Sequence, residues 1–78
     1  MNAQRIKQLE KLQALAQEIE NTLDDIWEDV DNSIDNLEFN EMEHLPAYDT
    51  LQVDRDNLNE AREAVADLYQ ALDACIDG

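Results

Sequence analysis

Apolar residues recur along the first half of the chain with the three- and four-residue steps of an α-helix. In a heptad that places Leu9 at position a, positions a and d hold Leu9, Leu12, Ala16, Ile19, Leu23, Ile26, Val30, Ser33 and Leu37. Position e adds Ile6, Trp27 and Ile34, so the apolar stripe is wider than that of a two-stranded coiled coil. A wide stripe favours packing in a bundle. The pattern predicts one long helix over residues 3–38.

The same pattern resumes after an interruption that contains the only proline, Pro46. Positions a and d then hold Leu51, Leu58, Ala61, Val65, Leu68, Leu72 and Cys75, with Tyr69 and Ile76 at position e. Asp54 also falls at a d position, and we assign it to the start of the helix, where an acidic side chain is favourable. Proline disfavours helix in the residue before it and is accepted in a first helical turn. We predict a connection over residues 39–49 and a second helix over residues 50–77, capped by Asp49 or Thr50 or opened by Pro46.

A chain of 78 residues forms at most one domain, and a hairpin of two helices buries little surface at this size. We therefore predict an all-α domain over residues 1–78, an antiparallel helical hairpin of two long amphipathic helices. We expect this hairpin to pair with a second copy as a homodimer, a four-helix bundle. The predicted oligomer seam is the row of e-position residues Ile6, Trp27, Ile34, Tyr69 and Ile76. The alternative is a monomer whose first helix breaks near residues 31–33 and packs back as a third helix.

Two segments have part of a metal-binding pattern. Asp29–Asp35 has the odd-position spacing of a calcium loop, but Ile34 replaces its turn glycine and Asn40 replaces its bidentate glutamate. Glu41 and His44 have the Glu-x-x-His spacing of di-iron bundles, but they fall in the predicted connection rather than in a helix. We therefore expect no metal and no cofactor. The chain also lacks a nucleophile motif and a phosphate loop, so we expect no enzyme.

The single cysteine, Cys75, cannot form a disulfide within the chain, which favours a reducing, cytoplasmic setting. Because it lies at an apolar position near a helix end, we expect it to be packed and unreactive. The first ten residues lack the apolar run of a signal peptide. No stretch approaches the roughly 20 apolar residues of a membrane span, so we expect no membrane contact.

Charge placement is the feature that points to a function. Twenty Asp and Glu against five Lys and Arg give a net charge of −15, and no Lys or Arg occurs between Leu12 and Asp54. This composition excludes direct binding of nucleic acid through a basic surface. Acidic residues step by four and three along about 21 Å of the first helix, at Asp24, Glu28, Asp31, Asp35 and Glu38. A second row on the other helix holds Asp56, Glu60, Glu63 and Asp67.

Neighbouring acidic residues at these spacings oppose helix formation by a few tenths of a kcal/mol per pair, and interleaved lysines would relieve that repulsion. Regular negative charge on a rigid rod is also what a nucleic-acid strand presents, with one phosphate about every 3.4 Å. We interpret the two rows as a surface that binds the basic groove of a nucleic-acid-binding protein. The alternative is an acidic face that only keeps the protein in solution.

In size, in charge and in these two acidic rows, the chain resembles the small acidic inhibitors encoded by phages and mobile elements, which include DNA-mimic and anti-CRISPR proteins. Those proteins share no motif or fold, so no site residue is carried over. The resemblance implies a non-enzymatic inhibitor that occupies a basic nucleic-acid channel. The two-helix shape is also similar to hairpin dimers that regulate RNA pairing, but those use basic and aromatic residues that this acidic surface lacks. A second hypothesis is a structural or adaptor hairpin that acts through its apolar seam.

Overall fold

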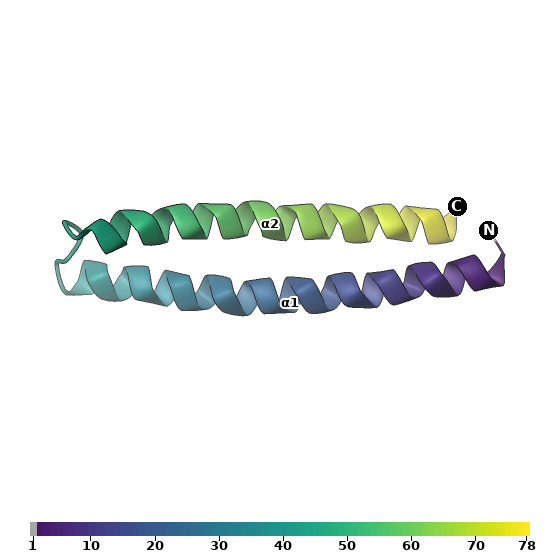
Figure 1. Ribbon diagram of the computed structural model, residues 1–78, viewed down its shortest axis with the longest axis horizontal. Coiled ribbons are helices and arrows are strands. Elements are labelled where there is room, and N and C mark those ends of the chain that lie inside the picture. The colour runs from purple at the N-terminus through teal and green to yellow at the C-terminus, as the bar shows by residue number, and fades with distance from the viewer. Residues whose placement is uncertain (1) are drawn as a thin grey trace.

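The computed structural model describes residues 2–78, which form two antiparallel helices, α1 (Ala3–Phe39) and α2 (Pro46–Asp77) (Figure 1). The hairpin measures 58 × 14 × 14 Å. Both chain ends lie at one end of this rod and the connection lies at the other, and α1 runs past the C-terminal end of α2 (Figure 1). The expected all-α helical hairpin is therefore confirmed.

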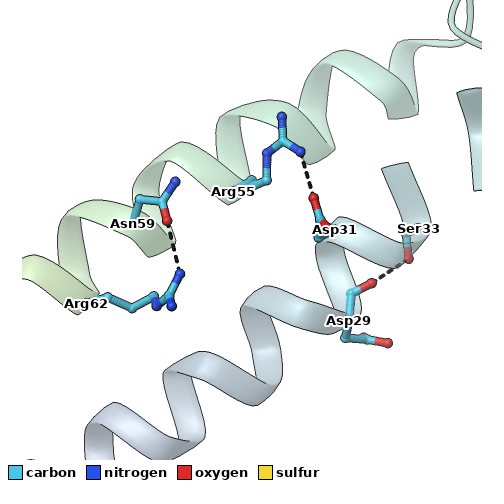
Figure 2. A network of polar contacts seen from close by, with 6 residues as sticks. All are labelled: Asp29, Asp31, Ser33, Arg55, Asn59 and Arg62. Carbon is cyan, nitrogen blue, oxygen red and sulfur yellow. Dashed lines mark hydrogen bonds and ion pairs between the residues drawn. The ribbon is translucent and has the colours of Figure 1, made fainter. Parts of the chain in front are cut away.

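The first helix continues through residues 31–33, where a break was the alternative expectation. Ser33 occupies a d position there, and its hydroxyl donates a hydrogen bond of 3.0 Å to the backbone carbonyl of Asp29 (Figure 2). This bond satisfies the hydroxyl within the helix, so the polar residue does not interrupt it. A third helix formed by the folding back of α1 is excluded.

Both helices begin where local chemistry favours a start. The Asn2 side chain accepts a hydrogen bond of 2.9 Å from the backbone N–H of Arg5, as an N-cap does. The second helix begins at Pro46, four residues before the predicted boundary, because proline is well suited to the first helical position. Asp49 and Thr50 therefore lie inside α2, and Asp49 is in its first turn, where the helix dipole favours an acid.

The end of α1 is closed by a Schellman motif in which glutamate occupies the usual glycine position. The backbone N–H of Glu41 donates to the Glu38 carbonyl at 3.1 Å, and that of Met42 donates to the Leu37 carbonyl at 2.8 Å. Glu41 has a φ of 57°, in the left-handed region that glycine enters without steric cost. The turn that reverses the chain is thus well hydrogen-bonded but strained at one residue.

The helices meet through heptad positions a and e rather than a and d. Within residues 2–78 the buried apolar side chains are Ala16, at position a and 2% exposed, and Ile34, at position e and 0% exposed. The d-position residues Ile19 and Ile26 remain 49% and 45% exposed. Two arginines at e positions of α2 pair with b-position aspartates of α1, in keeping with e sides that turn inward and d sides that turn outward.

The e-position row that the sequence suggested as an oligomer seam consequently lies largely within the hairpin. Ile34 is fully enclosed, and Ile6, Trp27 and Ile76 are partly buried. Tyr69 is 36% exposed. These side chains hold the two helices together, so the exposed apolar surface must be sought elsewhere.

Two further expectations differ from the structure. Cys75 is exposed rather than packed, because its d position faces outward like those of α1. Asp54 is also exposed, but it lies eight residues after the first residue of α2 rather than at its start. An outward d position accepts an acid without burial, which explains Asp54 better than the helix dipole does.

Candidate functional site

Two ion pairs join the helices along one edge of the hairpin. Arg55 Nη1 lies 2.8 Å from Asp31 Oδ1 (Figure 2), and Arg62 Nε lies 2.7 Å from Asp24 Oδ1. Arg62 Nη1 also donates to Asn59 Oδ1 at 3.2 Å (Figure 2). The four charged side chains keep 28–42% of their surface exposed, so solvent screens both pairs and each contributes at most about 1 kcal/mol to stability.

Arg62 also covers the indole of Trp27. Its guanidinium carbon lies 5.0 Å from the ring centroid, within the range of a cation–π contact. The Trp27 Nε1 atom is buried and has no hydrogen-bond partner among residues 2–78. Trp27 is therefore part of the contact between the helices, and its replacement by alanine would weaken the hairpin itself.

Acidic residues from both helices surround Arg55. The Asp31 carboxylate, which accepts a hydrogen bond from Arg55, raises the pKa of the guanidinium, although partial desolvation opposes this shift. The negative charges of Asp56 on α2 and Glu38 on α1 raise this pKa further. Residues of both predicted acidic rows thus lie close to one arginine.

A second acidic group surrounds Arg62. A shallow hollow on the same edge is lined by Glu20 and Asp24 of α1 and by Asn59, Arg62 and Glu63 of α2. Glu20 was not part of the predicted rows, because it occupies an e position that the heptad assigns to the apolar stripe. A charged residue at such a position was the signal in the sequence that this side of α1 is polar.

We call this side of the hairpin the acidic edge. The name covers eight carboxylates that lie around or between the guanidiniums of Arg55 and Arg62, those of Glu20, Asp24, Glu28, Asp31, Asp35, Glu38, Asp56 and Glu63. Seven of the nine predicted partner-binding residues belong to it. The other two, Glu60 and Asp67, lie at position c, on the side of α2 that points away from α1.

The carboxylates of the acidic edge are not equivalent. Asp24 and Asp31 are held by the two arginines, so they bind the helices together. Glu28 and Asp35 are exposed and form no ion pair within residues 2–78. The edge can therefore attract cationic groups through the unpaired carboxylates while the paired ones keep its shape.

The opposite side of the hairpin, at positions d and g, leaves apolar side chains open to solvent. Between 45% and 52% of the surface is exposed in Leu12, Leu15, Ile19, Ile26 and Leu68. Leu12, Leu15 and Ile19 share a hollow of about 270 Å³ with Leu68 and Leu72 of α2. Adjoining hollows continue along α1, one reaching Leu23 beside Glu18 and Thr22. The next is lined by Ile26, Val30 and Leu58 together with Asp54 and Asn57 of α2. We call this surface the apolar edge.

Neither segment with a partial metal pattern forms a ligand cage. Asp29–Asp35 lies within the continuous helix α1, so its carboxylates are distributed around the helix rather than around a loop. Glu41 and His44 are exposed in the connection. Across residues 2–78, no three His, Cys, Asp or Glu side chains gather in a way that could hold a metal ion.

The hairpin thus has two edges of unlike chemistry, one acidic and one apolar, on opposite sides of the same helix pair. Neither helix, within the described residues, offers an apolar segment of the length that a membrane crossing requires. No protein-family model, curated protein or solved structure matches this chain.

Proposed function

We propose that this protein is a non-enzymatic inhibitor whose acidic edge binds the basic surface of a nucleic-acid-binding host protein, as DNA-mimic and anti-CRISPR proteins do. The observation that carries this proposal is the pairing of Arg55 and Arg62 inside the hairpin. The arginines nearest to the acidic rows are already occupied, so they leave the other carboxylates uncompensated. An edge that served solubility alone would not need its charges gathered from two helices onto one side.

The dimensions of the edge suit a channel that holds a nucleic-acid strand. From Glu20 to Glu38 the edge runs along about 27 Å of helix, a length that holds about eight phosphates of one DNA strand. The helix fixes the backbone positions that carry these carboxylates before binding, so little backbone entropy is lost on association. Opposite charge speeds the encounter with a basic partner, and salt weakens it. We assign this activity to the cytoplasm, where the lone thiol of Cys75 would stay reduced.

Capture from host lysate tests the proposal. The tagged protein is immobilised at low salt, and the bound proteins are challenged with duplex DNA and identified by mass spectrometry. The informative variant is Glu28→Lys with Asp35→Lys, since both residues are exposed and unpaired. Asp31 is unsuitable because its replacement would also release Arg55.

The matched control is Glu60→Lys with Asp67→Lys. It makes the same change in charge at the same seven-residue spacing, but on the side of α2 that points away from α1. We expect DNA to release a nucleic-acid-binding protein from the wild type and the control, and the edge variant to capture none. Equal loss in both variants would show that only net charge matters, and binding that resists DNA would contradict mimicry.

A second candidate function is a structural or adaptor hairpin, and the apolar edge is the observation that favours it. Its exposed leucines and isoleucines offer a surface for another helix, and a four-helix bundle of two hairpins is one way to cover it. For this function, partner binding would be lost on substitution of Leu15 and would resist high salt. Charge reversal at Glu28 and Asp35 would leave it unchanged.

A further inference from the structure

We infer that the apolar edge is the interface of a two-fold dimer in which the two copies of the hairpin run antiparallel, with α1 packed against α1. This inference goes beyond the inhibitor function proposed above and fails or stands separately from it. It also moves the interface from the e positions, which the hairpin itself uses, to the d and g positions. Three observations support it: the length of the apolar edge, the surface that it leaves exposed, and the distribution of charge along the chain.

The apolar edge extends along the middle of α1. Leu12, Leu15, Ile19 and Ile26 span about four turns, and roughly half of each side chain faces solvent. Within residues 2–78 only Ala16 and Ile34 are buried, so most apolar side chains of the chain have no complete apolar environment. A second copy would supply the same row of side chains, because a two-fold interface is complementary to itself.

The exposed area agrees with one missing partner. The hairpin exposes 5728 Å². A typical folded monomer of 9.0 kDa exposes only about 4,900 Å². The excess is about 800 Å², which matches the roughly 800 Å² that each partner buries in a standard interface. An apolar partner surface of about this size therefore brings the chain to the exposure expected for a compact protein.

Charge along the chain selects the antiparallel orientation. Residues 21–65, which form the connection half of the rod in the register set by the two ion pairs, hold fourteen acidic residues and two arginines. The remaining residues, at the end where the termini lie (Figure 1), hold six acidic and three basic residues. A parallel dimer would place the two most acidic halves side by side. The antiparallel dimer sets each acidic half against the less acidic half of its partner, which lowers the repulsion.

A two-fold axis near Ile19 gives a specific pairing. It sets Leu12 of one copy against Ile26 of the other, since the two residues are seven positions from Ile19 in opposite directions. It also brings Lys11, at position c beside the apolar edge, near Asp25, at position c of the partner. The two acidic edges then lie on the outside of the bundle, so one dimer presents two copies of the acidic edge.

Sedimentation equilibrium of the whole chain tests the interface. We expect a dimer for the wild type and a dissociation constant raised about a hundredfold by Leu15→Gln with Ile19→Gln, because each dimer then loses four apolar side chains from its interface. Val53→Gln is the control: its side chain is 57% exposed at position c, on the side of α2 that points away from α1, and the dimer should persist because the proposed contact is made by α1. Circular dichroism confirms that each variant remains helical.

Salt dependence separates this contact from charge-driven binding. Two copies with a net charge of −15 each repel one another, so added NaCl should tighten the dimer as the Debye length falls from about 10 Å at 0.1 M to about 3 Å at 1 M. The complex with a basic partner should weaken over the same range. A monomer at all salt concentrations, or a dimer that survives both glutamine substitutions, would overturn the proposed interface.

The orientation is tested with spin labels on Cys75, which is exposed. Asp24 pairs with Arg62 and Asp31 pairs with Arg55, so Cys75 lies level with about residue 11 of α1. In the antiparallel dimer the two Cys75 Cα atoms are therefore about 24 Å apart along the axis. A measured distance in that range supports the orientation. Labels within about 10 Å, or a ready disulfide between copies, would indicate a parallel dimer and overturn it.

Discussion

Replacement of Ile34 by alanine tests where the core of the hairpin lies. Ile34 is the most buried side chain among residues 2–78, with 0% of its surface exposed. The substitution removes three carbon groups, worth about 0.8 kcal/mol each on burial, and leaves a cavity. We expect a loss of about 3 kcal/mol in the free energy of unfolding, which corresponds to a fall in Tm of roughly 12–24 °C for a domain of this size.

Ile26→Ala is the matched variant, since it makes the same chemical change on the same helix. Ile26 occupies a d position, where the heptad pattern placed the core, but it is 45% exposed in the hairpin. Its removal costs only about half of the transfer free energy, roughly 1.3 kcal/mol, and leaves no closed cavity. The two variants therefore differ by about 2 kcal/mol although the substitution is identical.

Urea unfolding followed by circular dichroism gives both values, at a protein concentration low enough to keep the chain monomeric. Equal losses in the two variants, or a greater loss for Ile26→Ala, would refute the packing through positions a and e. At higher protein concentration the loss in unfolding free energy caused by Ile26→Ala should grow, because the proposed dimer buries that side chain. The loss caused by Ile34→Ala should stay nearly constant, because the contacts of Ile34 lie within one chain.

Three further predictions concern local features of the hairpin. Glu41→Gly should stabilise the protein by about 1 kcal/mol in thermal unfolding, because glycine removes the left-handed strain, whereas Glu43→Gly removes the same charge without that gain. A double-mutant cycle on Asp31 and Arg55 should give a coupling below about 1 kcal/mol that shrinks with NaCl, since both side chains are partly exposed; a larger, salt-independent value would contradict this. Partial desolvation and the charges of nearby glutamates raise the pKa of Tyr48. In a variant without the other tyrosine, its absorbance at 295 nm should therefore titrate above pH 10.0, and the hairpin should lose stability as the pH rises through that range. A midpoint at or below 10.0 would contradict the placement of Tyr48.

The elements themselves follow from the sequence, since apolar spacing and the lone proline suffice to place two helices and a connection. What the heptad could not give was the rotation of each helix about its axis. Positions a, d and e of α1 are mostly apolar, so the sequence allows contact through either d or e. The choice depends on how the two helices pack together. Contacts such as Arg55 with Asp31 and Arg62 with Asp24 join residues that are separated by 24 and 38 positions in the sequence, so they form only in the folded hairpin.

The packing of the two helices also decides which acidic residues of the candidate site are paired, and the sequence alone could not show this. Arg55 and Arg62 are separated from the acidic rows in the sequence, so their pairing with Asp31 and Asp24 was visible only once the helices were packed. That pairing divides the acidic residues into two that hold the fold and others that remain free to bind. The same packing of the helices turns the d positions outward, among them that of Cys75, and leaves an open apolar edge.

The most direct test of the central claim is a competition measurement with the basic protein recovered from lysate. The apparent dissociation constant of its complex with this chain is determined at increasing concentrations of duplex DNA. If the acidic edge occupies the nucleic-acid channel, this constant should rise in proportion to the DNA concentration, and no complex of all three should form. A constant that does not change with DNA, together with a stable three-component complex, would contradict the proposal that the acidic edge takes the place of nucleic acid.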